Sequence, residues 1–344
     1  MTTTRMVPVA CALTLSLLGG GCFLLPESSD GKFVEADDVR LEVPGAVSDR
    51  DYDPTMVHGD VHDLVLVTTG NVNMWVTEIV EVAARVVEYL DGVPESSRDG
   101  DLRVYGPYAD RDGRDLAWLV KIGEDGDTTT YETFIGSRDA KSEADMDRLM
   151  SGTLVVGEKT RSGGFDMDFD VVEKYSEIKG EQGRLYTYSG DLAVTFERDI
   201  ETQKKHIDMD YIDFDVVYDG FLDSDKFHSD DTYSYHRAED GSVTFQLSVY
   251  GEWDDFNWSG PELEKMDLLA AWTADGAGRT RGTIVEVDGV GDMKHGDLQV
   301  DECFGDDGLL TWRQINEAYV DEVPDYNFGE AKSCALAEDA LKGG

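Results

Sequence analysis

The chain has 344 residues, of which 73 are acidic and 30 are basic, so its formal net charge at pH 7 is −43. This excess of negative charge argues against nucleic acid as a partner, and against docking of the protein surface on an anionic membrane. Apolar residues make up 40% of the chain, which is enough for one large core or two medium ones.

The first residues have the layout of a bacterial secretory signal. Arg5 supplies the positive start, an apolar stretch follows at 6–18, and a run of three glycines comes next. The apolar stretch is too short for a membrane-spanning helix, which needs about 20 residues. We therefore predict a signal peptide over residues 1–21 and an exported protein.

The glycine run leads to a cysteine at the expected cleavage site. The run Leu17-Leu18-Gly19-Gly20-Gly21-Cys22 is similar to a lipobox, although Gly19 stands where the usual leucine would be. In such a signal the cysteine is lipidated and becomes the new N-terminus. We predict lipidation of Cys22, and the alternative is an ordinary cleaved signal with a free or paired Cys22.

Residues 22–55 are polar overall, with glycine, serine, aspartate and three prolines and no sustained period. Such a segment fits a lipid-anchored tether that lifts a folded part off a membrane. The folded part is then expected as a single domain over residues 56–344.

The domain begins with a helical pattern. Apolar residues recur at steps of three and four, as at Ile79 and Val82, and charged residues occupy the opposite stripe. This pattern predicts an amphipathic helix at about 58–91, with an apolar face wide enough to be mostly buried. Gly92 and Pro94 would end it.

After residue 100 the pattern changes to alternation, β-branched and aromatic residues, and turns rich in glycine and aspartate. The connections are mostly too short for crossover helices, so the strands should be antiparallel. We predict a mainly β fold: a large curved antiparallel meander sheet or barrel-like sheet, packed on the long N-terminal helix. Short helices are expected at 143–150, 261–271 and 311–319. Strands are expected at 102–105, 116–122, 128–135, 153–158, 165–172, 184–188, 192–198, 207–218, 232–236, 242–250, 283–287 and 296–300.

Two aspartate-rich segments echo each other along these strands. The run Asp168-Phe169-Asp170-Val171-Val172 recurs as Asp213-Phe214-Asp215-Val216-Val217. If both segments are strands, their carboxylates share one face with Asp166, and oxygen ligands of this kind would suit Ca²⁺. A solvated face opposite the core explains the same alternation. The five aspartates Asp166, Asp168, Asp170, Asp213 and Asp215 are therefore weak metal candidates, and no metal is predicted.

Two cysteines remain once Cys11 is removed with the signal and Cys22 is acylated. Cys303 and Cys334 are 31 positions apart, and neither has a histidine or a second cysteine at ligand spacing. In an oxidising compartment such a pair usually bridges, and a loop of this length would stabilise the fold by about 3 kcal/mol. We predict a disulfide that ties down the C-terminal segment.

Several short motifs resemble a family of exported bacterial lipoproteins of myxobacterial type, for which no activity is known. They are the lipobox-like start, Val104-Tyr105-Gly106-Pro107-Tyr108, Trp272 followed by Gly276-Ala277-Gly278-Arg279, and Glu302-Cys303 with the downstream Cys334. The resemblance implies a lipoprotein of the outer envelope and implies nothing catalytic.

No sequence signature of catalysis is present: there is no G-x-S-x-G, S-x-x-K, P-loop or dinucleotide fingerprint. The expected function is a non-enzymatic binding or structural module of the cell envelope, without a cofactor, held by its lipid anchor in a membrane, expected to be the outer membrane. The alternative is a carrier of lipid or another apolar ligand in a cavity between sheet and helix. A hydrolase with a carboxylate pair is the third possibility, although carboxylates are too abundant to locate one.

Overall fold

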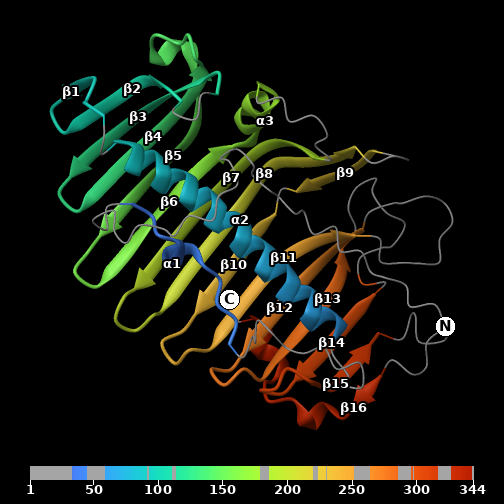
Figure 1. Ribbon diagram of the computed structural model, residues 1–344. Coiled ribbons are helices and arrows are strands. Elements are labelled where there is room, and N and C mark those ends of the chain that lie inside the picture. The colour runs from blue at the N-terminus through green and yellow to red at the C-terminus, as the bar shows by residue number, and fades with distance from the viewer. Residues whose placement is uncertain are drawn as a thin grey trace.

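The computed structural model describes residues 33–44, 59–90, 93–110, 114–178, 186–219, 224–229, 231–251, 264–285, 296, 298–316 and 327–342. The predicted signal peptide and Cys22 lie outside these residues. Most of the described chain forms one mainly β architecture, an antiparallel sheet in which fifteen strands follow one another in chain order (Figure 1). The sheet path runs from β1 to β16 without closing, so the barrel-like alternative is wrong. One further strand, β9, pairs with β8 beside this path.

The strands alternate direction throughout, as short connections require. They are β1 (Ser97–Asp99), β2 (Leu102–Ala109), β3 (Leu116–Asp125), β4 (Thr128–Ser137), β5 (Met146–Val156), β6 (Thr160–Asp168), β7 (Tyr186–Asp199), β8 (Lys205–Asp219), β9 (Ser224–Ser229), β10 (Thr232–Arg237), β11 (Val243–Gly251), β12 (Glu264–Trp272), β13 (Gly278–Val285), β14 (Gln299–Phe304), β15 (Leu310–Ile315) and β16 (Phe328–Gly329).

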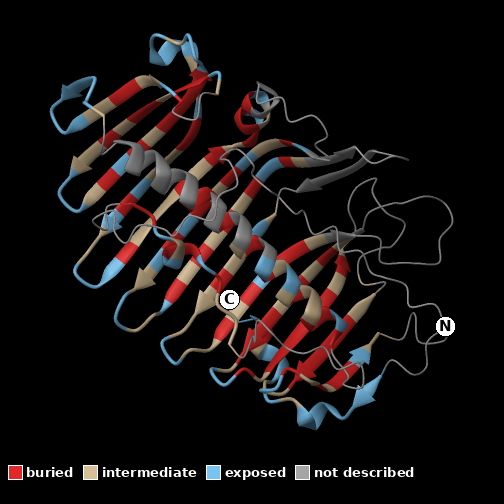
Figure 2. Cartoon of the chain, viewed as in Figure 1, coloured by how far each residue is buried: buried red, intermediate tan, exposed pale blue. Residues whose placement is uncertain are grey.

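The sheet has two unlike faces, because successive side chains of a strand point to opposite sides. On β6, for example, Phe165 and Met167 are buried whereas the neighbouring Asp166 and Asp168 are partly exposed. Figure 2 shows the same alternation along most strands. We call the face that carries the apolar core the inner face and the opposite one the outer face.

Two helices lie against the inner face: α1 (Ala36–Val39) and α2 (Asp60–Leu90), which crosses the strands in Figure 1. In its described part α2 buries one stripe of side chains, namely Val61, Val65, Val72, Val76, Ile79 and Val80. Gly282 of β13 permits a close approach, because a Cβ there would lie 3.3 Å from Val61. None of the described helices is both long and apolar enough to cross a membrane.

The start of α2 is fixed by a carboxylate from a distant strand. Glu302 of β14 is fully buried and accepts hydrogen bonds from the main-chain nitrogens of Asp60 (2.9 Å) and His62 (3.0 Å). Arg313 of β15 donates to the same side chain at 2.8 Å. A negative group that satisfies free N–H groups at a helix N-terminus stabilises the helix. Burial raises the pKa of Glu302, although Arg313 and the His62 N–H oppose that rise.

Three expected short helices are wrong in whole or in part. The segment expected as a helix at 143–150 has one 3-10 turn, η1 (Glu143–Asp145), and then enters β5. The helices expected at 261–271 and 311–319 coincide with β12 and β15 in their described parts. On β12 the residues Met266, Leu268, Ala270 and Trp272 are all buried, a period of two that belongs to a strand, and Ala271 between the last two is buried as well.

Residues 33–44, which we call the strap, differ from the tether expected over 22–55. Phe33, Val34, Val39 and Leu41 of the strap are buried in the core of the domain. The ring of Phe33 lies 6.3 Å from that of Tyr131 on β4. This part of the expected tether is therefore packed on the inner face of the sheet, beside α2.

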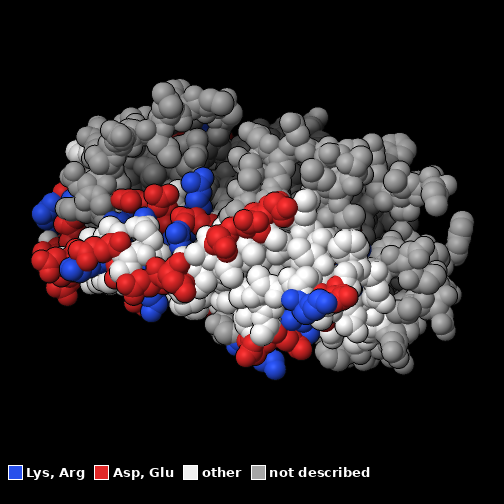
Figure 3. Space-filling view, turned by 90° about the horizontal axis from the view of Figure 1, so that it is seen from below, with Lys and Arg blue, Asp and Glu red and all other residues white. Residues whose placement is uncertain are grey.

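The acidic excess lies largely at the surface. In the view from below, Asp and Glu side chains gather in several groups with Lys and Arg among them, next to a region without charged residues (Figure 3). Distributed surface charge of one sign favours solubility and does not determine the fold.

Candidate functional site

The outer face is hollowed over β2 to β7 into a trough of about 550 Å³. Directly paired residues of neighbouring strands point to the same face, so the pairing registers define its lining. One row across the strands is Lys121, Glu132, Ser151, Asp166 and Ala193. The next row is Gly123, Thr130, Thr153, Gly164 and Thr195.

Glycines make the hollow. At Gly164 of β6 a Cβ would lie 2.4 Å from the carbonyl oxygen of Val194, and at Gly163 one would lie 2.1 Å from that of Thr153. Only residues without side chains let β5, β6 and β7 approach so closely. Glycine weakens a strand by roughly 0.5–1 kcal/mol relative to alanine, so this curvature is obtained at a cost in local stability.

The trough walls are polar. Thr130, Thr153 and Thr195 are exposed in the second row, where each presents a hydroxyl that can donate and accept a hydrogen bond. In the first row the Ser151 hydroxyl donates to Asp166 at 2.6 Å. The trough thus offers hydroxyl and carboxylate groups side by side.

One cation stands at the β3 end of the trough. Lys121 Nζ lies 2.7 Å from Glu143 and 3.3 Å from Glu132. Burial acts to lower the pKa of Lys121, but the hydrogen bonds to both glutamates outweigh it and leave that pKa raised. The ammonium therefore stays charged at neutral pH.

The trough floor is apolar and closed by aromatic residues of the inner face. Tyr131 is buried, and a Cβ at Gly152 would lie 2.3 Å from its hydroxyl oxygen. Burial, with the charge of Asp166 as a second cause, raises the pKa of Tyr131 well above its usual value. Phe165 and Val194 complete the floor. Among the described residues that line the trough there is no histidine or cysteine, the usual nucleophile and base partners.

The structure places the first group of weak metal candidates on two different elements. Asp166 lies in the trough, but the strand expected at 165–172 ends at Asp168, and α3 (Phe169–Ile178) follows. Asp168 accepts a hydrogen bond from the main-chain nitrogen of Val171 at 2.9 Å and so caps this helix. Asp170 is exposed in the first turn of α3. The continuous ladder of three carboxylates is therefore wrong.

Asp191 of β7, which sequence reasoning missed, pairs with Asp168 across the sheet. Burial first, and then the charges of Asp168, Asp170 and Asp166, raise the pKa of Asp191. The outer face is thus acidic at the end of the trough where α3 begins.

The second group of weak metal candidates lies in β8. Asp213 is exposed with a φ of 46°, at an irregularity in the β7–β8 pairing, and Asp215 follows in the same strand. The two echoed segments do meet, but through their phenylalanines, because the rings of Phe169 and Phe214 pack edge to face at 5.0 Å. In the part of the chain that the structure describes, no group of three or more His, Cys, Asp or Glu side chains is arranged to hold a metal ion.

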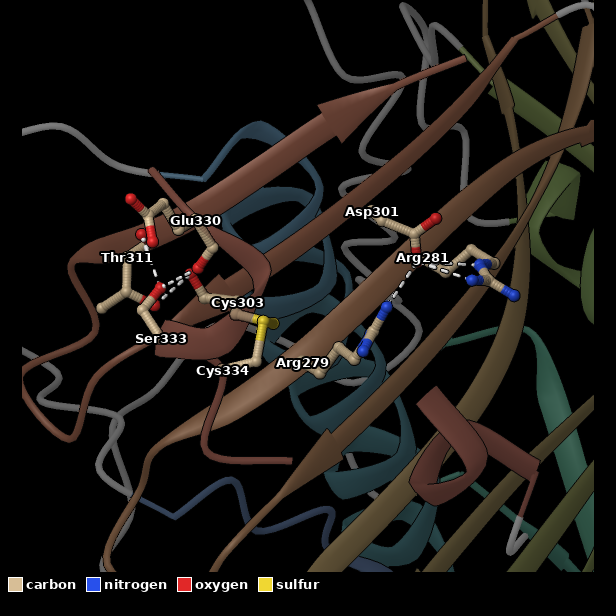
Figure 4. The surroundings of a disulfide bond; sticks show 8 residues. All are labelled: Arg279, Arg281, Asp301, Cys303, Thr311, Glu330, Ser333 and Cys334. Carbon is tan, nitrogen blue, oxygen red and sulfur yellow. Dashed lines mark hydrogen bonds and ion pairs between the residues drawn. A yellow bond between two sulfur atoms is a disulfide. The ribbon is translucent and has the colours of Figure 1, made fainter. Parts of the chain in front are cut away.

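The Cys303–Cys334 disulfide is present, which confirms that predicted pairing (Figure 4). Cys303 lies in β14 next to Glu302, and it faces away from α2, so the bridge holds the C-terminal segment against the outer face. Ser333, at the end of η3 (Ala331–Ser333), donates to the carbonyl oxygens of Thr311 and Glu330. On the same side Arg281 joins Asp301 (2.8 Å). Cys22, the predicted lipidation site, lies outside the described residues.

The trough was not predicted from the sequence. Its signal is the glycine content of neighbouring strands, with Gly152 on β5 and the pair Gly163-Gly164 on β6. Three successive threonines at the start of β4 are a further sign, because Thr130 faces outward while Thr129 is buried. These signals gain meaning only when the registers of the strands are known.

Comparisons of the chain with protein-family models, with curated proteins and with solved structures found no match.

Proposed function

We propose that the protein is a non-enzymatic binding module of the bacterial cell envelope, and that its trough binds a segment of polysaccharide. The carrying observation is the trough itself: about 550 Å³ on the outer face, walled by hydroxyl and carboxylate groups from neighbouring strands. This volume is within the range of ligand sites, roughly 300–1,000 Å³. Sugar hydroxyls need partners that donate and accept hydrogen bonds: Thr130, Thr153 and Thr195 can do both, and Ser151, whose proton is donated to Asp166, can accept.

The shape of the trough favours a chain over a compact ligand. It is open along the sheet surface, so a polymer can enter and leave at either end. Its two carboxylates, Glu132 and Asp166, are already engaged by Lys121 and Ser151. This engagement favours binding over acid–base catalysis, and supports a module in preference to a hydrolase.

The packing of the inner face also supports a binding module, in preference to a carrier of an apolar ligand. The described side chains of α2 that face the sheet are buried in one core cluster with strands β12 to β14 and the strap. Along this described part of α2, the protein's own side chains occupy the space that a lipid ligand between sheet and helix would need.

A lipid on Cys22, after export, would hold the module in the envelope, with the outer membrane as its expected site. The support for this is the lipobox-like run and the apolar stretch before it. Intact mass measurement of protein from host membranes should show a diacyl or triacyl addition at Cys22. An unmodified mature chain would remove the anchor from the proposal.

Binding can be tested with an array of bacterial surface polysaccharides and peptidoglycan fragments, followed by calorimetry on a hit. The variant Thr153→Trp fills the trough from an exposed position of β5. The matched control is Val155→Trp, two residues along the same strand and face, outside the trough lining. We expect Thr153→Trp to weaken binding at least tenfold and the control to stay within twofold of the unmodified protein. Absence of any hit, or equal binding by both variants, would overturn the proposal.

A further inference from the structure

Four basic residues stand side by side on the inner face. Arg161 of β6 pairs with Arg198 of β7, Arg198 with Lys205 of β8, and Lys205 with Arg237 of β10. We call them the basic row. Like charges directly opposite each other in a sheet are destabilising, and the chain has only 30 basic residues against 73 acidic ones. Such a concentration of positive charge on a largely buried face needs an acidic partner.

The strap supplies that partner. Asp38 is fully buried, and Arg161 donates to both of its carboxylate oxygens at 2.9–3.0 Å. Arg198 lies 3.7 Å from the same carboxylate. Further along the strap, Glu42 forms an ion pair with Arg237 and lies 3.7 Å from Lys205. Every member of the row therefore faces a carboxylate of the strap.

The main chain of the strap is recognised as well. The Leu41 N–H donates to the Asn73 side chain of α2 (2.6 Å), and the Asn73 amide donates back to the Leu41 carbonyl (2.7 Å). The Tyr235 hydroxyl accepts from the N–H of Glu42 (3.2 Å) and donates to its carbonyl (2.9 Å).

The strap's carbonyl groups are bound by the basic row itself. Lys205 Nζ donates to the carbonyl oxygens of Asp37 (2.7 Å) and Arg40 (3.0 Å). Arg161 donates to the carbonyl oxygen of Phe33 at 2.7 Å. Paired contacts to N–H and C=O, with pockets for alternate side chains, are how receptors hold an extended peptide.

The strap adds no strand to the sheet. In residues 33–44 the backbone forms only α1 and extended segments, and the sheet path begins at β1. The strap can therefore leave without breaking any ladder hydrogen bond of the sheet. The attraction within a buried ion pair such as Asp38–Arg161 is largely offset by the cost of removing both charges from water. When the strap leaves, both groups regain their hydration, so docking of the strap on the sheet is reversible.

We propose that the basic row, with Asn73 and Tyr235, is a binding site for an extended acidic peptide, and that the strap is its intramolecular occupant. The ligand has the chemistry of the strap: a buried aspartate, apolar residues on either side of it and a second carboxylate four residues later. An acidic segment of a partner protein enters when the strap leaves. This inference does not depend on the trough, which lies on the opposite face.

The strap holds its site at an effective concentration in the millimolar range, as a short linked segment does, so a free peptide competes poorly with it. The test therefore weakens the strap within the full chain. Asp38→Ala removes the carboxylate bound by Arg161. A fluorescent peptide with the sequence of residues 33–44 is then added in trans, and binding is measured by fluorescence anisotropy.

We expect the full-length Asp38→Ala protein to bind this peptide at least tenfold more tightly than the unmodified protein does. Adding Arg161→Ala, or placing alanine at the Asp38 position of the peptide, should reduce binding at least tenfold. The matched control is Glu35→Ala, because Glu35 is exposed and 3.7 Å from Arg161; it should behave as the unmodified protein. Trypsin cleavage after Arg40 reports strap release, and circular dichroism reports the fold.

A second variant, Val39→Ala with Leu41→Ala, weakens the packing of the strap by shortening two of its buried apolar side chains. It replaces Asp38→Ala in the experiment if that variant does not fold. A folded protein whose strap is open to trypsin but which does not bind the peptide would overturn the proposal. Where the peptide does bind, sedimentation separates the two sources of the natural ligand. Self-association that the peptide abolishes assigns the ligand to the strap of a second copy, and a monomer that binds the peptide assigns it to another protein.

Discussion

Arg161 of β6 binds Asp38, a residue 123 positions earlier in the chain, through three hydrogen bonds in a buried setting. Asp38 is fully buried and the Arg161 side chain is 6% exposed. This contact joins the strap to the middle of the sheet, so the segment that leads toward the predicted lipid anchor is part of the folded domain.

Arg161→Ala should lower the free energy of unfolding by about 3 kcal/mol. Removing one partner of a buried pair commonly costs 3–5 kcal/mol, and the lower end is expected because the strap can leave and rehydrate Asp38. Urea unfolding at neutral pH measures the change. The control is Arg148→Ala, whose half-exposed pair with Asp166 spans 3.5 Å and should contribute less than about 1 kcal/mol. Equal effects of the two variants would contradict the prediction.

Glu302→Ala should destabilise the protein by about 3 kcal/mol, because it leaves Arg313 buried without its carboxylate and frees two N–H groups at the start of α2. Thermal unfolding followed by circular dichroism measures this. Glu338→Ala is the matched control: its carboxylate also bonds an arginine, Arg281, at 2.9 Å, but is 57% exposed. If Glu338→Ala lost as much stability as Glu302→Ala, burial of the carboxylate would not be the cause of the destabilisation.

Replacing both cysteines, Cys303→Ser with Cys334→Ser, should cost about 3–4 kcal/mol, from the loop entropy of a separation of 31 residues. The loss should begin in the C-terminal segment that the bridge ties to β14. This segment includes η4 (Glu338–Lys342), which contacts β12 and β13 and contains the buried Leu341. Relative to the unmodified protein, hydrogen exchange should accelerate more in η3 and η4 than in β3 and β4. Uniform acceleration across the sheet would contradict this assignment.

The class of the fold was readable from the sequence, and some elements within it were not. Period-two alternation with short turns predicts an antiparallel sheet, as residues 192–198 show within β7. The pattern failed at β12, where leucine and alanine have high helix propensity, because the neighbouring strands β11 and β13 override that preference. The strap was misread because its acidic residues suggested a solvated tether, although Asp38 is buried.

Of the candidate sites, only the disulfide could be predicted, because the number of cysteines determines their pairing. With Cys11 and Cys22 assigned to the signal, Cys303 had one remaining partner, and the pairing followed. The aspartate ladder failed because Phe169 begins α3, a boundary that alternation does not reveal. The basic row and the trough depend on the register between strands separated by turns and irregularities, and a shift of one residue would move either set to the other face.

Lys205, which binds carbonyl groups of the strap, makes the free energy of unfolding depend on pH. Burial is the main cause that lowers the pKa of Lys205 to about 8, with the nearby Arg198 as the next cause. Between pH 8 and 10.5 the unfolded chain therefore holds a proton on this lysine that the folded protein has lost. Stability rises with pH wherever the unfolded state binds more protons, so this group penalises folding fully below about pH 8 and not above pH 10.5. The whole effect is on the order of 3 kcal/mol, from about 1.4 kcal/mol for each pH unit.

Lys205→Met removes this titration while keeping an unbranched side chain in the buried site. The free energy of unfolding of the unmodified protein, minus that of Lys205→Met, should increase between pH 8 and 10.5, whatever other groups titrate in both proteins. Lys204→Met is the matched control, because Lys204 is the exposed neighbour in sequence, and its difference from the unmodified protein should stay flat. Urea unfolding at half-unit steps of pH measures both differences. A difference for Lys205→Met that falls with pH would mean that its contacts to the strap carbonyls outweigh the cost of burying the charge.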